Sequence, residues 1–313
     1  MRSEEGEPEA VIGLVADIQY ADKVDLIQSN GRVRKYRECI SKLEAATEMW
    51  NTVEKEIGVR SKFMVLQVGD LVDGYEDSED EDSGVKKARE DLEKVASVFE
   101  KAGYNTRNER SNLLHVVGNH CLSVGWEYLA DRLGMKGDWW YSRDLSDNWT
   151  LVVLNSMDVS LHSPHGSREK ALAENWMSNH SDVINAVSWN GMFGEEQIKW
   201  LTTTLRAARK QDKNVIVFGH HPVVDSDGRM AKHLAWNADE MQELFEKEGV
   251  SVYISGHCHQ GGAKRVGKVD HLTLEALVDS DERGAHGVLR LYKDKVVLQG
   301  SGCMKSRTFE LDR

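Results

Sequence analysis

Carboxylate, amide and imidazole side chains follow several short apolar runs of the kind that form buried strands. These residues are Asp17 and Gln19, Asp70 and Asp73, Asn119 and His120, His220 and His221, and His257 and His259. An Asp after a strand often only caps a turn, and a lone His is more often a hydrogen-bonded residue than a ligand. Open α/β sheets, however, bind their ligands at the carboxyl ends of strands. The repetition of this pattern along one chain therefore favours a shared site.

The side chains of this set favour particular cations. Carboxylates, an amide carbonyl and imidazoles without thiolates suit manganese, iron or zinc. Asp70 follows the apolar run 63–68, and its two carboxylate oxygens could each bind one cation. Cys258 lies between His257 and His259, and we interpret it as a packing or pocket-lining residue and not as a ligand. The set thus indicates a metal site in which Asp70 could bridge two ions.

The order of these residues resembles the calcineurin-like metallophosphoesterase superfamily over residues 11–260. The motifs that carry the resemblance are Asp17, Gly69-Asp70-x-x-Asp73, Gly118-Asn119-His120, Gly219-His220 and Gly256-His257-x-His259. The resemblance implies a four-layer α/β/β/α sandwich of two mixed sheets with a two-metal centre. It implies that one metal is bound by Asp17, Asp70 and His259, and the other by Asp70, Asn119, His220 and His257.

The first motif departs from the superfamily pattern, which usually has Asp-x-His where this chain has Asp17-Ile18-Gln19. The side-chain carbonyl of Gln19 is a harder ligand than an imidazole, so it fits manganese and would complete the shell of the first metal. Together with residues 16–22, 155–158 and 256–262, this departure resembles the manganese-dependent ADP-ribose/CDP-alcohol diphosphatases. Cys121 also stands where the superfamily often has a Glu.

The resemblance implies hydrolysis of the phosphoanhydride of nucleoside diphosphate conjugates, such as ADP-ribose, CDP-choline and other CDP-alcohols. We expect a metal-activated hydroxide to attack, releasing a nucleoside monophosphate and a phosphorylated sugar or alcohol. We expect His120, held in place by the ligand Asn119, to protonate or stabilise the leaving group. Tyr20, Tyr141 and Trp189 could stack on the base, although packing in the core is the more common arrangement for any one such side chain.

Two other functions remain open at this point. One keeps the metals and changes the substrate, giving a phosphomonoesterase, a protein phosphatase or a cyclic nucleotide phosphodiesterase. The other is a catalytically silent fold that serves as a binding scaffold, because a fold does not by itself fix a function. Such scaffolds usually lose ligands, whereas this chain lacks only the first-motif His, where Gln19 stands.

Composition restricts the partners. The 313 residues are 29% charged and 40% hydrophobic, which is typical of a soluble globular protein, and the formal net charge of −12 argues against a nucleic-acid binder. The acidic run at 76–82 is predicted to be a solvated loop. The first residues form no signal peptide, no apolar run is long enough to span a bilayer, and the four cysteines show no disulfide spacing. We therefore expect a cytoplasmic monomer without nucleic-acid or membrane partners.

Hydrophobic spacing predicts the elements that position the site. Steps of three and four predict helices over 33–57, 85–102, 195–210 and 239–248, and apolar runs predict strands over 10–16, 63–68, 113–117, 149–154, 214–218 and 252–254. Strand, helix and strand in succession predict parallel βαβ units. Residues 272–277, 287–292, 296–300 and 308–311 are predicted to be antiparallel strands. We expect one domain over 1–313, with residues 270–313 in the second sheet and residues 160–190 as a pocket wall.

Overall fold

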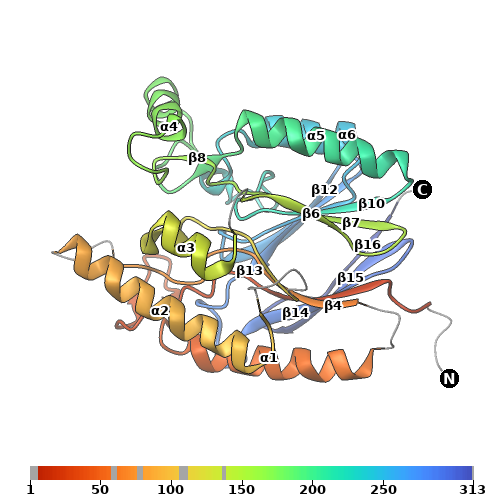
Figure 1. Cartoon of the computed structure of the whole chain (residues 1–313), viewed down its shortest axis with the longest axis horizontal. Helices are drawn as coiled ribbons and strands as arrows, with labels where there is room; N and C mark the ends of the chain where they lie inside the picture. Colours follow the sequence, from red (N-terminus) through yellow and green to blue (C-terminus); the bar gives the residue numbers. More distant parts are fainter. Residues whose placement is uncertain (1–5, 58–61, 76–79, 106–111, 136–138, 312–313) are drawn as a thin grey trace.

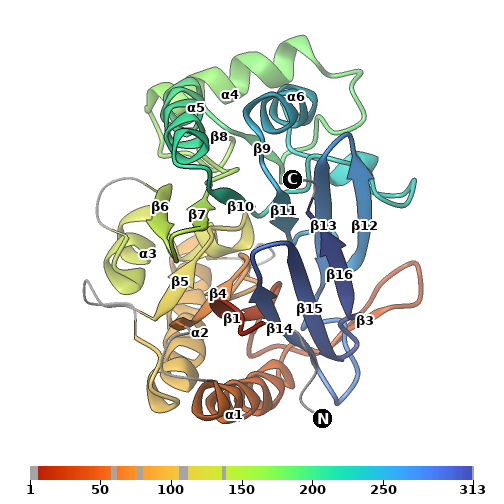
Figure 2. The same ribbon diagram turned by 90° about the vertical axis from the view of Figure 1, so that its right-hand side faces the viewer.

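The computed structural model describes residues 6–57, 62–75, 80–105, 112–135 and 139–311. Within them, two six-stranded mixed sheets pack face to face, and helices cover the outer side of each sheet (Figures 1 and 2). Figure 1 shows α1 (Cys39–Glu56) and α2 (Glu81–Lys101) below the sheets, with α5 (Glu195–Lys210) and α6 (Ala238–Glu248) above them. The α/β/β/α sandwich expected from the sequence is confirmed.

The first sheet contains β1, β4 and β5 as parallel neighbours, each pair joined by a helix on the outer face. Its strand order is β16–β15–β14–β1–β4–β5. Its strands are β1 (Ala10–Val15), β4 (Lys62–Gln67), β5 (Leu113–His115), β14 (Ala285–Leu291), β15 (Lys295–Gly302) and β16 (Arg307–Glu310). Because β1, β4 and β5 run in the same direction, their carboxyl ends lie at the same edge of the sheet.

The second sheet has a parallel centre of β7, β10, β11 and β13, with antiparallel strands at both edges. Its strand order is β12–β13–β11–β10–β7–β6. Its strands are β6 (Tyr141–Asp144), β7 (Trp149–Val153), β10 (Asn214–Phe218), β11 (Val252–Ser255), β12 (Gln260–Val266) and β13 (Val269–Glu275). The parallel strands again end at a common edge.

Smaller elements decorate the carboxyl ends of the strands. They are the hairpins β2 (Leu26–Ile27) with β3 (Val33–Arg34) and β8 (Val159–Ser160) with β9 (Gly191–Met192), the helices α3 (Trp126–Leu133) and α4 (Arg168–Asn179), and the 3-10 helices η1 (His120–Val124) and η2 (Ala231–His233). Among the described helices, none combines the length and the apolar composition that a membrane crossing requires.

Alternation along the strands builds separate cores on the two faces of each sheet. In β1, Val11 and Val15 join the core between the first sheet and its helices α1 and α2, whereas Ile12 and Leu14 join the core between the two sheets. In the same way, alternate residues of β10 lie in the core between the second sheet and α5 and α6, and in the core between the two sheets. The packing of both faces fixes the strand ends, and therefore the site, on a rigid base.

Three sequence predictions need correction. The helix predicted over 33–57 begins only at Cys39, because residues 33–34 pair with 26–27 in a hairpin. Residues 270–313 were predicted to lie in the second sheet, but among their described strands β13 alone does so. Strand β14 pairs antiparallel with β1, so β14, β15 and β16 belong to the first sheet. The acidic run does not form a loop throughout, since Glu81 and Asp82 begin α2, where their charges favour the helix dipole. Residues 76–79 lie outside the described residues.

Candidate metal centre

The carboxylate of Asp70 lies at the centre of the predicted ligand cluster. Nε2 of Gln19 donates a hydrogen bond to Oδ2 of Asp70 at 3.1 Å, and the backbone N–H of His120 donates to Oδ1 at 2.9 Å. Nε2 of His220 lies 3.2 Å from Oδ2 of Asp70. One ligand atom from each of Asp70, His220 and His257 lies within 4.8 Å of the others. The two sheets therefore bring side chains from distant parts of the chain to one point.

Asp17 and His259 form a second group beside the first. Nε2 of His259 lies 3.5 Å from Oδ1 of Asp17. The backbone N–H of His257 donates to both oxygens of Asp17, at 3.1 and 3.0 Å. The turn that carries His257 and His259 is thereby attached to the strand end that carries Asp17, and Gln19 links this end to Asp70.

The backbone at these strand ends is strained. Five non-glycine residues in the described ranges have positive φ, and four of them are predicted ligands: Asp17 (50°), Gln19 (42°), Asp70 (54°) and His257 (64°). A non-glycine residue in this region costs on the order of 1–3 kcal/mol and persists where the surroundings impose it. Such residues cluster at functional sites, so the strain marks this edge of the two sheets independently of residue type.

Glycines in the motifs make room for the ligands. A Cβ atom at Gly118 would lie 2.1 Å from Oδ1 of Asp70, and one at Gly256 would lie 2.6 Å from Oδ2 of Asp17. Both distances are far below van der Waals contact. The glycine before Asn119 and the glycine before His257 are thus required by the close approach of the carboxylates from the first sheet.

Each imidazole of the cluster uses one ring nitrogen to contact a group outside it. The distances are 2.8 Å from His220 Nδ1 to the carbonyl oxygen of Val68, 3.2 Å from His257 Nε2 to Oδ1 of Asn190, and 3.1 Å from His259 Nδ1 to Oδ1 of Asp279. All three partners are acceptors, so these nitrogens carry hydrogen. When the rings are neutral, as metal binding requires, the opposite nitrogens present lone pairs, which is the arrangement that metal-binding histidines show.

Buried atoms without partners show that the cluster fits metal ions. Oε1 of Gln19, Oδ1 of Asn119 and Nε2 of His220 are buried and have no hydrogen-bond partner in the described part of the chain. Leaving such atoms unpaired is costly, and native proteins rarely do so. Together with the carboxylates of Asp17 and Asp70, these atoms are oxygen and nitrogen donors that suit divalent cations such as manganese.

Comparison with known proteins agrees with this geometry. Residues 10–261 match the protein family Calcineurin-like phosphoesterase, a span that covers most of the chain. The chain belongs to the calcineurin-like phosphoesterase family. The resemblance derived from the motifs is therefore confirmed.

Several relatives of this phosphoesterase carry one name. The Manganese-dependent ADP-ribose/CDP-alcohol diphosphatase of Arabidopsis thaliana is 32% identical, over 99% of this chain and 100% of the relative. The protein of the same name from Homo sapiens is 25% identical, over 94% of this chain and 91% of the relative. The crystal structure of a dimetal phosphatase from Danio rerio has a TM-score of 0.82 at 24% identity, covering 98% of this chain and 100% of that one, and this likeness shows the fold.

Burial and neighbouring charges shift the pKa values of the side chains in the phosphoesterase site. Burial alone would lower the pKa of His220, but the carboxylate of Asp70 outweighs this effect and raises it to about 9. Burial would raise the pKa of Asp70, but His220 and His120 hold it well below its ordinary value. Burial, followed by the neighbouring His221 and His220, lowers the pKa of His257. The negative charge of Asp70 thus keeps a proton on His220 while His257 stays neutral, and a cation bound at the site would take the place of that proton.

His120 lies beside the predicted ligands with part of its ring accessible. Its side chain is 19% exposed, and its Nδ1 lies 2.7 Å from the carbonyl oxygen of Asp73. The carboxylate of Asp73 pairs with Lys23 and, at 3.2 Å, with Nη1 of Arg34. The carboxylate of Asp73, which also follows a strand, therefore neutralises the charged side chains of Lys23 and Arg34 beside the ligand cluster. The backbone carbonyl of Asp73 orients His120.

Two residues that hold the imidazoles were not predicted from the sequence. Asn190 is the last residue of the segment 160–190 and Asp279 lies beyond β13, so neither belongs to a recognisable motif. His221 follows the predicted ligand His220, but its Nδ1 lies 2.8 Å from Oγ of Ser156. Ser156 lies within residues 155–158, which carried part of the family resemblance, but its contact with His221 was not predicted.

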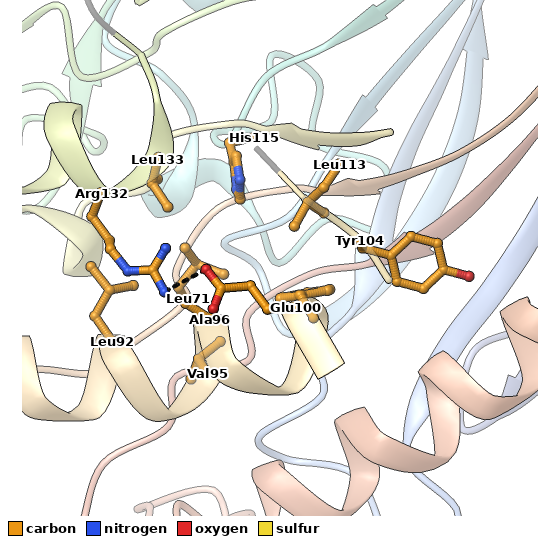
Figure 3. A pocket seen from close by; sticks show the side chains of 11 residues that line it. Leu71, Leu92, Val95, Ala96, Glu100, Tyr104, Leu113, His115, Arg132 and Leu133 are labelled. Carbon is orange, nitrogen blue, oxygen red and sulfur yellow. Dashed lines mark ion pairs between the residues drawn. The ribbon is translucent and has the colours of Figure 1, made fainter. Parts of the chain in front are cut away.

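A cavity elsewhere in the molecule does not serve as a substrate site. Figure 3 shows it between α2, β5 and α3, where apolar side chains surround His115 and the ion pair between Arg132 and Glu100. Its volume is about 10 Å3. This is about the space of one water molecule, so the cavity is a packing defect behind β5.

Proposed function

We propose that this chain hydrolyses the phosphoanhydride of nucleoside diphosphate conjugates such as ADP-ribose, CDP-choline and other CDP-alcohols, with two manganese ions as cofactors. The products would be a nucleoside monophosphate and a phosphorylated sugar or alcohol. The observation that carries the proposal is the match over nearly the whole chain to relatives named for this activity. Gln19 at the first motif supports it, because its unpartnered oxygen adds a hard ligand beside Asp70.

We propose the ligands of each ion from the contacts in the site. Asp17, Gln19, Asp70 and His259 would hold one, and Asp70, Asn119, His220 and His257 would hold the other. When bound, two such cations polarise phosphoryl oxygens and make a water molecule nucleophilic at neutral pH. The carboxylate of Asp70 is central because its Oδ2 lies near both Gln19 of the first group and His220 of the second, while Oδ1 accepts from the amide of His120.

His120 would handle the proton of the leaving group. The carbonyl oxygen of Asp73 can only accept, so Nδ1 of His120 carries a hydrogen and is fixed in place. Nε2 is then the nitrogen that exchanges a proton with the departing phosphate oxygen. Asn119, as a ligand of one ion, would help to position the adjacent His120, whose backbone N–H donates to Oδ1 of Asp70.

We further propose that residues 1–313 form one metallophosphoesterase domain that acts as a cytoplasmic monomer without nucleic-acid or membrane partners. The net charge of −12 supports the absence of a nucleic-acid partner, and the free cysteines suit a reducing compartment. Light scattering is expected to give the mass of one 35.4 kDa chain, and fractionation of cells to give the protein in the cytosol. A stable dimer, or unfolding in two separate steps, would contradict the proposal.

The activity is tested with chelator-stripped protein given manganese or magnesium. ADP-ribose, CDP-choline and p-nitrophenyl phosphate are offered in parallel. The proposal expects manganese-dependent release of AMP and CMP with little cleavage of the monoester. Cleavage of the monoester alone would overturn the diphosphatase assignment in favour of a phosphomonoesterase. No cleavage by protein that binds manganese would favour a scaffold or an unusual diesterase.

A further inference from the structure

An aromatic cavity lies beside the metal centre and has no part in the chemistry described so far. Its volume is about 230 Å3. Its walls come from the start of α3, from the residues before β6 and from the segment on both sides of β8. The residues that line it are Trp126, Trp139, Trp140, Asn155, Asp158, Pro164 and Glu169. Pockets that enclose a whole drug-sized ligand usually measure about 300 to 1,000 Å3, so this cavity suits one group of a larger substrate.

Two connections place this tryptophan cavity next to the catalytic centre. Asn155 lines the cavity, and the next residue, Ser156, contacts His221, whose ring centroid lies 4.1 Å from that of His257. On the other wall, Trp126 begins α3, which one residue, Gly125, separates from η1 (His120–Val124). A substrate whose phosphates lie at the metal centre could therefore extend one end past His120 into the cavity.

The aromatic walls are held in place. Trp126 and Trp139 meet edge to face, with ring centroids 4.8 Å apart and planes at 82°. Nε1 of Trp126 donates a hydrogen bond to the carbonyl oxygen of His162 at 2.7 Å. Indole faces attract cations more strongly than other aromatic side chains, and pairs of them form the cages that bind quaternary ammonium groups. The cavity thus offers a preformed aromatic corner.

The charges in the cavity select the same kind of occupant. Asp158 and Glu169 are acidic, and the described residues that line the cavity include no Lys or Arg. The backbone N–H of Gly194 and Nε2 of Gln197 both donate to Oδ2 of Asp158, at 3.0 and 3.1 Å, so Oδ1 remains as an acceptor for an occupant. Burial raises the pKa of Asp158 to about 6, and a nearby cation would favour its charged form. A phosphate or a sugar acid would be repelled here.

We propose that the tryptophan cavity binds the cationic head of the alcohol in substrates such as CDP-choline. This assignment rests on the proposed diphosphatase activity. The trimethylammonium group lies against Trp126 and Trp139, and its charge is balanced by Asp158. The cavity thereby gives the enzyme a preference for CDP-alcohols with a cationic head over those with a neutral head.

The proposal is tested by comparing CDP-choline with CDP-glycerol, whose alcohol carries no charge. Trp126→Leu removes the aromatic face and keeps an apolar side chain, and Asp158→Asn removes the charge and keeps the shape. In each variant, the ratio of kcat/KM for CDP-choline to that for CDP-glycerol is expected to fall about tenfold, the size of one desolvated cation–π contact. Trp200→Leu, on α5 and outside the cavity, is the matched control and should leave the ratio unchanged. An unchanged ratio in both cavity variants would overturn the proposal.

A binding measurement separates this proposal from the proposed function. Choline alone is titrated into the wild-type protein, Trp126→Leu and Trp200→Leu, while tryptophan fluorescence is followed and circular dichroism confirms folding. Saturable quenching in the wild type and the control, weakened about tenfold in Trp126→Leu, supports the cavity even if no substrate is hydrolysed. Equal quenching in all three proteins, or quenching by glycerol as strong as by choline, would contradict it. If the protein binds choline but hydrolyses neither CDP-alcohol, the proposed diphosphatase activity is rejected and the choline site is kept.

Discussion

The two sheets deliver different atoms to their common edge. The first sheet supplies oxygen, from Asp17, Gln19, Asp70 and Asn119, whereas the second supplies nitrogen, from His220, His257 and His259. Of the four predicted ligands with positive φ, three lie on the first sheet, where the backbone sets the direction of the Asp17, Gln19 and Asp70 side chains. The imidazole rings of the second sheet are oriented by outer partners, such as Asn190 for His257.

In the proposed metal centre, neither sheet therefore supplies all the ligands. Asp70 and His220 are 3.2 Å apart across the gap between the sheets, and a cation bound there would link them. Metal binding should therefore stabilise the packing of one sheet on the other, since a preformed site does not exist in the unfolded chain. The residues proposed to bind metal are therefore distinct from those that position the ligand side chains, and each class can be tested alone.

Removing the shared carboxylate should have the largest effect. Asp70→Ala is expected to lower turnover on the order of 1,000-fold or more and to lower metal content with it, because a single preorganised charge is already worth about 100- to 1,000-fold. Turnover and manganese content are measured on the same preparation. Asp212→Ala is the matched control, since Asp212 also has positive φ but is exposed and remote from the site. A metal-replete, active Asp70→Ala protein would reject the two-metal centre.

His120 tests whether the first sheet contributes more than ligands. His120→Ala is expected to lower turnover on the order of 100-fold or more while metal content stays near that of the wild type, because general acid groups contribute about 100- to 10,000-fold. Parallel losses of metal and turnover would instead assign His120 a structural part.

Asn190 tests the positioning of nitrogen on the second sheet. Asn190→Ala is expected to weaken manganese binding about 10- to 100-fold, because it removes the acceptor that fixes the His257 ring. Asn190→Asp keeps an acceptor oxygen and should restore much of the affinity. The control is Asn179→Ala, since the Asn179 amide donates hydrogen bonds to Asn175 in its own helix. Calorimetric titration with manganese measures all three, and wild-type affinity in Asn190→Ala would show that the ring needs no such partner.

His115 tests whether an imidazole in the first sheet affects the stability of the fold without affecting metal binding. Burial lowers its pKa to about 3, whereas the unfolded chain takes up a proton near pH 6.5. The unfolded state therefore binds more protons as the pH falls, and the folded state loses stability between pH 7 and pH 5. This residue should account for about 2 kcal/mol of that loss. In His115→Gln, urea unfolding should depend less on pH by this amount, with manganese affinity unchanged. An identical pH dependence in both proteins would contradict the assignment.

Much of the fold was predictable because hydrophobic spacing is local. The helix over Glu195–Lys210 and the strand over Asn214–Phe218 match their predicted limits, since periodicity and the flanking polar residues define both. The hairpin of β2 and β3 was missed, because its register depends on pairing between short exposed strands. The prediction placed the strands β14, β15 and β16 in the wrong sheet. Strand order depends on long-range pairing, which the local alternation of apolar and polar residues does not encode.

For the site, the sequence by itself determined which atoms are available and that each follows a strand. That information is local, since an apolar run and the polar residue after it lie within a few positions. Only the tertiary structure decided which nitrogen of each imidazole is free, and that Asp73 faces cations at the rim. It also placed Asn190 against His257, 67 residues away, and Trp126 against Trp139. Such pairs depend on how the layers pack, and that packing is fixed by the whole core together.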